Sequence, residues 1–482
     1  MSRFVMAIDA GTTGVRAVLF DRQSVAVAIA YREIVSRYPF PGWVEQDPDV
    51  IWTSTREVID EVGGRAGATA SDIAAIGITN QRSSIMAWDG PTGRALSPLI
   101  VWQDTRAAQR CRELQDRGLF ITPMMAVTKA EWLVANVKPV AEAAQSGRLR
   151  LGTPNSWLVA CLCGDIHVSD HGNASATGFY SYFRTGWDAA LMDAVGIEEN
   201  WLPRLVDSMG EVGRTRAAAF GAEVPVAGMA GDQQASLFGL ACLEAGETKC
   251  SYGTSAMITA NSGETVAFGA PGTYPIVGWR SGDRTIFSLE GQVVTAGAAV
   301  QWLRDGLGVI GDATESAALA ASVPDNGGVW AVPAFQGLGT PMMQAEARAM
   351  IGGLSRGSTR AHVTRALLEG IAQRVADVAD SLNEGVTRTP SLRVDGGASR
   401  NDFLLQCQAD LLGVPVERSA TTDGAALGAA RLAGIGVGFW PGQQAAQWNS
   451  ERVFEPAISA DERQLRRNQW KRRLETVLAD LN

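Results

Sequence analysis

The feature that most constrains the fold is a hairpin pattern that occurs in both halves of the chain. The segment "FVMAIDAGTTGVRAVLFD" (4–21) predicts a strand, a Gly/Thr turn and a second strand. The same order of elements returns in "TKCSYGTSAMITAN" (248–261), and "LRVDGGASRNDFLLQCQADLL" (392–412) predicts a strand, an Asp, two glycines and a helix. This repetition predicts two related α/β domains that face each other across a cleft, with a hinge near residue 240.

Helical segments separate the predicted strands. "PDVIWTSTREVIDEV" (48–62) is amphipathic and opens at Asp47-Pro48, "STRAHVTRALLEGIAQRVADVADSL" (358–382) is the longest regular pattern, and "DGAALGAARLAGIG" (423–436) is made of small residues. The last segment, "ERQLRRNQWKRRLETVLADLN" (462–482), predicts a basic amphipathic helix. We interpret it as a solvated face with one packed apolar stripe, and a partner site is the alternative.

Composition and charge exclude several classes of protein. The chain has 482 residues, which indicates more than one domain, and its net charge is −9 with a pI near 5.1. Nucleic-acid binding is not expected, because neutralising phosphates needs a basic face, although a small anion could still be held locally. No apolar run of about 18 residues and no signal-peptide pattern is present. We therefore expect no membrane span and a reduced, cytoplasmic protein.

The cysteines and histidines do not have the spacing typical of a zinc site. None of the six cysteines forms a C-x2-C pair, so we interpret them as small buried apolar residues. His167 and His171 are four residues apart, but "DIHVSDHGNAS" (165–175) predicts a strand followed by a loop rather than a helix. With no third ligand nearby, a zinc site is not expected.

The turns suggest a way to hold phosphate groups without lysine. None of the four lysines follows a glycine, which excludes a P-loop, and no G-x-G-x-x-G follows the first strand. "DAGTTG" (9–14) instead offers Asp9 for hydrated Mg²⁺, two Thr hydroxyls, and glycines that allow close approach. "YGTS" (252–255) and "DGGAS" (395–399) are similar, and the second precedes a helix. A plain tight turn is the alternative for each, but three together favour a nucleotide.

Several segments, taken together, resemble the FGGY family of carbohydrate kinases, and within it the glycerol kinase branch. They run in order from residue 7 to 440: "AIDAGTTGVRAVLFD", "GITNQRSSIMAWD", "VWQDTRAAQRC", "GMAGDQQASLFG", "GTSAMI", "TAGAAVQWLRDGL", "VPAFQGLGTP", "RALLEGIAQRV", "VDGGASRNDFLLQCQADLLGVPVERS" and "ALGAARLAGIGVGFW". The resemblance implies an α/β fold of two ribonuclease-H-like (actin-like, sugar kinase/Hsp70 type) domains flanking a central ATP/substrate cleft. The expected domains are residues 1–241, for the acceptor and the first phosphate turn, and residues 242–482, for the nucleotide.

The family also implies ATP with Mg²⁺ as donor, and a primary hydroxyl of a small polyol or sugar as acceptor. By resemblance, Asp232 of "GMAGDQQ" is the general base, for which an Asx-turn is the structural alternative. Asp9 would bind Mg²⁺ through water. The expected ATP-binding residues are Thr12, Thr13, Gly14, Arg16, Thr254, Gly297, Gln301, Gly397 and Asn401. The expected substrate-binding residues are Arg82, Ser83, Trp102, Met124, Asp232, Gln233 and Met257.

Three acceptor positions depart from the glycerol kinase pattern. Ser83 stands where a Glu is expected, Met124 where a Tyr is expected, and Met257 where a Phe is expected. The pocket thus loses a carboxylate and two rigid rings, and gains two flexible thioethers, which predicts relaxed or redirected specificity. Alternatively, Ser83 together with a water molecule takes the place of the Glu. Glycerol, the best single choice of acceptor, then stays the substrate.

Other readings stay open. A tetritol, a pentitol or a ketopentose such as xylulose fits the acceptor site as well as glycerol does. A non-catalytic actin-like nucleotide-binding module is a different class of function, and the presence of both Asp9 and Asp232 favours an enzyme instead. Members of the family are often homodimers or homotetramers, and no segment of this sequence decides the oligomeric state or reveals an allosteric effector.

Overall fold

The computed structural model describes residues 2–387, 389–442 and 447–479, which pack into two compact units. The first unit comprises Met1–Gly239, Val277–Ile286 and Ala425–Gln447. The second comprises Leu240–Ile276, Phe287–Gly424 and Trp448–Asn482. The sequence changes unit at residue 240, near the predicted hinge, but a segment close to the C-terminus packs with the N-terminal unit.

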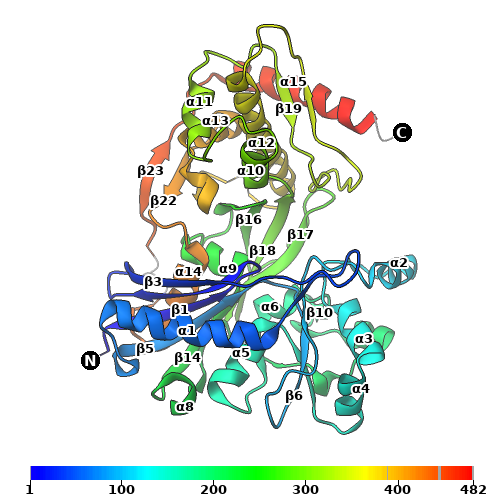
Figure 1. Ribbon diagram of the computed structural model, residues 1–482, viewed down its shortest axis with the longest axis vertical. Helices are drawn as coiled ribbons and strands as arrows, with labels where there is room; N and C mark the ends of the chain where they lie inside the picture. The colour runs from blue at the N-terminus through cyan, green and yellow to red at the C-terminus, as the bar shows by residue number, and fades with distance from the viewer. Residues whose placement is uncertain (1, 388, 443–446, 480–482) are drawn as a thin grey trace. The chain divides into compact units, whose positions relative to one another are not determined.

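The first unit is built on a six-stranded mixed sheet in the order β13-β14-β5-β1-β2-β3 (Figure 1). Strands β1, β2 and β3 are antiparallel, β5 and β14 continue parallel to β1, and β13 is antiparallel to β14. The strands are β1 (Phe4–Ala10), β2 (Gly14–Phe20), β3 (Ala26–Glu33), β5 (Ile73–Asn80), β13 (Met209–Arg214) and β14 (Pro225–Gly231).

The second unit repeats this arrangement in a seven-stranded sheet in the order β17-β18-β16-β15-β21-β22-β23. Strands β15, β16 and β18 are antiparallel, β21 and β22 run parallel to β15, and β23 is antiparallel to β22. The predicted internal repeat is therefore confirmed in the strand order. The strands are β15 (Thr248–Tyr252), β16 (Ala256–Gly263), β17 (Tyr274–Ser281), β18 (Arg284–Val293), β21 (Leu392–Asp395), β22 (Val416–Ser419) and β23 (Ser450–Phe454).

Helices and short strands complete each unit. The first unit has α1 (Pro48–Ala66), α2 (Ala108–Asp116), α3 (Val127–Asn136), α4 (Lys138–Gln145), α5 (Pro154–Cys163), α6 (His171–Ser175), α7 (Ala189–Val195), α8 (Ala217–Phe220), α9 (Asp232–Gly239) and α14 (Gly424–Gly436). The second has α10 (Gly297–Asp305), α11 (Glu315–Ala321), α12 (Arg360–Leu382), α13 (Asp402–Leu412) and α15 (Ala460–Ala479). Short strand pairs are β4 (Glu45–Gln46) with β7 (Leu99–Ile100), β6 (Met86–Asp89) with β8 (Leu149–Gly152), β9 (Val168–Asp170) with β12 (Arg204–Val206), β10 (Tyr180–Ser181) with β11 (Gly186–Trp187), and β19 (Trp330–Val332) with β20 (Met350–Gly352).

Small residues let α14 pack directly against the sheet of the first unit. A Cβ on Gly77 of β5 would lie 2.0 Å from the carbonyl oxygen of Ala429, and one on Gly228 of β14 would lie 2.5 Å from the amide nitrogen of Ala433. Neither distance can be accommodated without moving backbone. The glycines and alanines of α14 and its two neighbouring strands thus bring helix and sheet backbones into contact.

Two of the helices predicted from the sequence show the features expected of them. α1 begins after Asp47, whose carboxylate caps the helix by accepting from the amide of Asp49, and Pro48 occupies the first turn. α15 buries Trp470, Leu474 and Val477, so the interpretation of one packed apolar stripe is confirmed. Residues 480–482 of that segment lie outside the described residues.

The histidines and the helices bear on the expectations about metal sites and membrane spans. His171 begins the short helix α6 rather than a loop, which corrects the expectation for this stretch, and His167 precedes β9, so the two rings belong to different elements. The described part of the chain holds no cluster of three His, Cys, Asp or Glu side chains able to bind a metal ion. Within that part, no helix combines the length and the apolar character that crossing a bilayer requires.

Candidate active site

The β1–β2 turn has the geometry expected of a phosphate-binding turn. The amide of Gly11 donates to the carbonyl of Gly14 over 2.9 Å and closes the turn. A Cβ on Gly14 would lie 2.4 Å from the carbonyl oxygen of Arg32 on β3, so only glycine fits there. The Thr13 side chain is exposed, and the backbone carbonyl of Thr13 accepts a 3.0 Å hydrogen bond from the Tyr31 hydroxyl. The turn is therefore held from β3 while its outer face stays open.

Asp9, near the end of β1, is a largely buried carboxylate, 17% exposed, without full compensation. Arg16 lies opposite it on β2, with Arg16 Nε 3.7 Å from Asp9 Oδ2, which is an ion pair rather than a close hydrogen bond. Burial raises the pKa of Asp9 to about 6, Arg16 lowers it, and the charge of Asp232 raises it further. An oxygen ligand in this state suits a hydrated divalent cation, which would relieve the same electrostatic cost.

Asp232 is the first residue of α9 and follows directly from β14. Strand and helix join at Asp232 with no intervening loop, although glycines precede this residue. Asp232 Oδ1 accepts from the amide of Gln233 over 2.9 Å and lies 3.3 Å from Arg82 Nε. A Cβ on Gly231 would be 2.5 Å from Arg82 Cγ, so the glycine makes room for this pairing.

The segment after β5 and the segment after β7 supply the polar and aromatic side chains expected at the acceptor. Ser83 has a left-handed backbone (φ 61°), and its hydroxyl donates to the carbonyl of Ala176 over 2.7 Å. The amide of Trp102 donates to the Ser84 hydroxyl, and its indole nitrogen donates to the Thr12 hydroxyl, each over 3.0 Å. Arg82, Ser83 and Trp102 are thus connected to the phosphate turn and to Asp232 within one unit.

Two glutamines that the sequence analysis did not select tie these segments together. Gln81 Oε1 accepts from the hydroxyls of Thr12 (3.3 Å) and Ser84 (3.0 Å), and its amide nitrogen donates to Gln46 Oε1 over 2.8 Å. The Gln46 amide in turn donates to the Thr12 carbonyl. Gln81 could have been suspected from its place in "NQRSS", beside Arg82. No pattern marks Gln46, whose bonds to Thr12 and Gln81 join it to residues 34 and 35 positions away.

Two of the expected ATP-binding turns come together in the second unit. The amide of Gly297, at the start of α10, donates to the carbonyl of Gly253 over 3.0 Å, and the Thr254 carbonyl accepts from the amide of Ala296 over 2.9 Å. A Cβ on Gly297 would lie 2.5 Å from the Gly253 carbonyl oxygen. Gly396 has φ 88°, and its Cβ would lie 2.4 Å from the Tyr252 carbonyl oxygen. The turns after β15 and β21 therefore adjoin each other at the start of α10.

The other expected residues of the second unit lie on surrounding elements. Gln301 is exposed on α10, and Gly397 is exposed on the 3₁₀ helix Gly397–Arg400. Asn401 caps α13 and donates to the Ser316 hydroxyl over 3.0 Å. Met257 lies on β16, where its sulfur accepts from the Tyr274 hydroxyl over 3.7 Å. The remaining expected acceptor residue, Met124, lies three positions before the start of α3 in the first unit.

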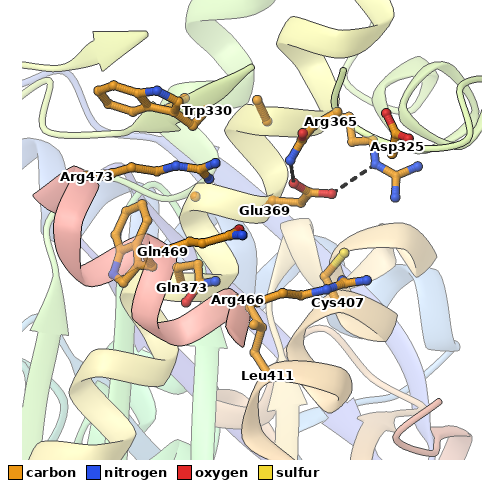
Figure 2. Close-up of a pocket in the computed structure, with 15 residues that line it drawn as sticks. Asp325, Trp330, Arg365, Glu369, Gln373, Cys407, Leu411, Arg466, Gln469 and Arg473 are labelled. Atoms are coloured by element: carbon orange, nitrogen blue, oxygen red, sulfur yellow. Dashed lines mark hydrogen bonds and ion pairs between the residues drawn. The ribbon is translucent and has the colours of Figure 1, made fainter. Parts of the chain in front are cut away.

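A cavity of about 190 Å³ in the second unit contains none of these residues. It lies beside α12, α13 and α15, and Figure 2 shows its polar side chains turned toward one another. Glu369 pairs with Arg365 over 2.9 Å and accepts from Asn326 over 2.8 Å. The Glu369 carboxylate is thus satisfied by its neighbours, unlike that of Asp9.

Comparison with known proteins defines the class. Residues 4–239 match the N-terminal domain, and residues 248–437 the C-terminal domain, of the FGGY family of carbohydrate kinases. The chain belongs to this family and is a phosphotransferase of the carbohydrate kinase type.

Individual relatives share nearly the whole length of the chain. It is 44% identical over 486 residues to a glycerol kinase of Symbiobacterium thermophilum, with 98% of each protein covered. A crystal structure of Plasmodium falciparum glycerol kinase with ADP superposes with a TM-score of 0.92 at 29% identity, covering 99% of each chain. A xylulose kinase structure from Rhodospirillum rubrum gives 0.84 at 26% identity and the same coverage. The predicted two-domain α/β fold is confirmed.

Proposed function

We propose that this protein transfers the γ-phosphoryl group of ATP to a primary hydroxyl of glycerol, giving glycerol 3-phosphate and ADP. The observation that carries the proposal is the convergence of Asp232, Arg82 and Trp102 beside the Asp9 turn in the first unit. The high identity to a glycerol kinase over the full length supports the choice of acceptor.

Asp232 is proposed as the general base. Its carboxylate would accept the proton of the substrate hydroxyl as that oxygen forms its bond to phosphorus and the bond to ADP breaks. Arg82, whose Nε lies 3.3 Å from Asp232 Oδ1, holds the carboxylate in place and offers further N–H groups to substrate oxygens.

Ser83 gives a physical reason why glycerol can be kept without the Glu of the family pattern. Its hydroxyl proton is directed at the Ala176 carbonyl, so its oxygen lone pairs face outward as acceptors. A Glu carboxylate at this position would also act only as an acceptor. Trp102 would supply an apolar wall for the carbon chain of glycerol, with its indole nitrogen already bonded to Thr12.

The phosphates would be held by backbone amides and hydroxyls rather than by a lysine. In the first unit the proposed contacts are Thr12, Thr13, Gly14 and Arg16. Asp9 would hold Mg²⁺ through water, and bound Mg²⁺ supplies positive charge against the phosphate oxygens. In the second unit the proposed contacts with ATP are Thr254, Gly297, Gln301, Gly397 and Asn401. We thus assign residues 1–241 to the acceptor and the first phosphate turn, and residues 242–482 to the nucleotide.

A different acceptor is the second candidate, and it is favoured by Met124 and Met257. Both side chains are flexible where the family pattern has rigid rings, which allows a larger pocket. The similarity to a xylulose kinase structure shows that this fold also occurs among kinases named for five-carbon substrates.

A coupled assay of ADP release tests the proposal. Purified protein with ATP and Mg²⁺ is given glycerol, dihydroxyacetone, erythritol, xylitol or xylulose, and kcat/KM is compared. Glycerol should exceed each of the others at least tenfold. A larger acceptor with the highest kcat/KM would replace glycerol as substrate and retain the base. Equal ADP release with and without any acceptor would contradict the kinase mechanism.

A further inference from the structure

Lys129 occupies an unfavourable place for a cation. It is one of only four lysines, its side chain is fully buried, and it lies in the first turn of α3. A positive charge at a helix N-terminus opposes the helix dipole, and burial removes its hydration. Within the described residues Lys129 makes no ion pair that would compensate these costs. Its placement therefore has to be explained by its hydrogen bonds.

Those hydrogen bonds join two segments that are far apart in sequence. Lys129 Nζ donates to the carbonyl oxygens of Trp102 and Met124, both over 3.0 Å. Trp102 follows β7, whereas Met124 lies in the segment that leads into α3. Each residue is an expected acceptor contact, so a single nitrogen fixes the separation of two backbones whose side chains would face the same substrate.

Trp102 is more tightly held than Met124. Besides the bond from Lys129, its amide donates to Ser84 and its indole to Thr12. Met124 has a flexible side chain and relies on its backbone for position. Removing Lys129 would therefore affect the Met124 side of the acceptor pocket most.

The charged neighbours of Lys129 are already engaged with other groups. Asp104 is buried, accepts from the amide of Val44 over 2.6 Å, and pairs with Arg106 over 2.8 Å. Arg106 lies over the ring of Trp43 with 3.8 Å to its centroid. Burial lowers the pKa of Lys129 to about 7, with Asp104 and Cys111 raising it and Arg106 lowering it. Protonated or neutral, the amine retains at least the two N–H donors that the two carbonyls need.

We propose that Lys129 is a positioning residue that sets acceptor specificity by clamping the backbones of Trp102 and Met124. The inference rests on the proposed function of the same site. Without the clamp, Met124 moves away from Trp102, the acceptor pocket widens, and glycerol loses its advantage over longer polyols.

The test replaces Lys129 by Met, which has a similar length but no donor. The K129M protein should show a KM for glycerol raised at least tenfold and a KM for ATP within twofold. The ratio of kcat/KM for glycerol to kcat/KM for erythritol should fall at least fivefold. This ratio does not depend on the fraction of folded enzyme, so a loss of stability alone would leave it unchanged. If K129M does not fold, K129L gives the same measurement with a shorter side chain that also lacks a donor.

Lys249 provides the matched control. It is also fully buried, lies on β15 in the second unit, and donates to the Ser251 hydroxyl over 2.9 Å. K249M should lower thermal stability but keep the acceptor ratio within twofold of the wild type. An equal shift of the ratio in K249M and K129M would overturn the inference, because it would show a general effect of losing a buried amine.

Two further variants separate this inference from the proposed acceptor site. Met124→Ala and Trp102→Leu should themselves change acceptor KM or the acceptor ratio. If they do and a folded Lys129 variant does not, the role of Lys129 is wrong while the acceptor site stands. If neither changes acceptor kinetics, the acceptor site itself is wrong and the inference falls with it.

Discussion

The indole nitrogen of Trp102 donates a 3.0 Å hydrogen bond to the hydroxyl oxygen of Thr12. Trp102 is the proposed acceptor wall and Thr12 belongs to the proposed phosphate turn, so one bond connects both reactants' sites within the first unit. Thr12 is further bound by Gln81 and Gln46. The two sites are therefore expected to influence each other's affinity.

Trp102→Phe should reduce this coupling. The ring keeps an apolar wall but loses the bond to Thr12, which is worth about 1 kcal/mol, or about fivefold in affinity. Calorimetric titration of glycerol with and without ADP measures the coupling, and by linkage ADP titrated with and without glycerol must give the same factor. Trp187→Phe is the control, since that indole donates to the Pro203 carbonyl away from the site. Unchanged coupling in Trp102→Phe would show that Thr12 acts independently of the acceptor wall.

Asp232→Asn should abolish turnover while leaving the fold intact. The amide keeps the size of the carboxylate but cannot take up the substrate proton, so kcat should fall about 10²- to 10⁴-fold. ADP affinity should change little, because the proposed phosphate contacts are on other residues. Steady-state ADP release and nucleotide titration measure both effects. Turnover within tenfold of the wild type would assign the base to another group.

Much of this site could be predicted because its chemistry is local in sequence. Asp9 and the Gly/Thr turn lie within six residues, and Asp232 lies beside Gln233 in a short motif. The repeated hairpins also indicated two related α/β units. The internal repeat was accessible because each copy carries its own turn residues.

The unpredicted features depend on contacts across long stretches of chain. Gln46 meets Gln81 35 residues away, and Lys129 meets Trp102 27 residues away. No local pattern distinguishes these side chains from ordinary surface Gln and Lys. The small residues of α14 were visible, but that α14 packs on Gly77 and Gly228 follows only from the three-dimensional structure. The role of Gly231, which makes room for Arg82 where β14 passes directly into α9, likewise follows only from the structure.

The substitution Asp9→Asn should have opposite effects on activity and stability. Its folded pKa of about 6 is above the ordinary value of 3.8, so between these pH values the native state binds more protons than the unfolded state. Stability from this group is present at low pH and is lost as pH rises through 6, by about 3 kcal/mol at most. Asp9→Asn should therefore be more stable than the wild type at pH 7.5, by ~1–2 kcal/mol, yet inactive.

Urea unfolding at pH 7.5 and pH 4.5 measures this difference. The stability advantage of Asp9→Asn should shrink at pH 4.5, where the wild-type carboxyl is itself protonated. An Asp9→Asn protein no more stable than the wild type at pH 7.5 would show that Arg16 fully compensates the carboxylate.

Ser83→Glu should move specificity toward glycerol if Ser83 marks a relaxed pocket. The new carboxylate adds a strong acceptor for glycerol hydroxyls and occupies space that a four-carbon polyol needs. The left-handed backbone at φ 61° adds no large cost, because its penalty arises from the Cβ that Ser83 already carries. The ratio of kcat/KM for glycerol to that for erythritol should rise at least fivefold. A fall in this ratio would indicate that the lone pairs of Ser83 already do what the Glu would do.

Three glycine substitutions should separate the site from the fold. Gly231→Ala places a Cβ 2.5 Å from Arg82 Cγ, a side-chain atom that can move, so Arg82 should leave Asp232 and kcat/KM should fall at least tenfold with little loss of stability. Gly428→Ala places a Cβ 1.7 Å from the Ala235 carbonyl oxygen, where only backbone can yield, and should destabilise the whole first unit. Gly64→Ala, on α1 with no atom within 4 Å, should stabilise by about 0.5–1 kcal/mol with normal activity.

Melting temperature and kcat/KM, measured for the same three proteins, decide the outcome. Parallel losses of stability and activity in Gly231→Ala would mean that Gly231 serves the strand–helix junction. An active Gly231→Ala protein would mean instead that the position of the Arg82 guanidinium is not needed for turnover. A selective loss of activity places the requirement for glycine in the Arg82–Asp232 pair, because Gly64→Ala controls for the added methyl group and Gly428→Ala shows what a packing failure does to both quantities.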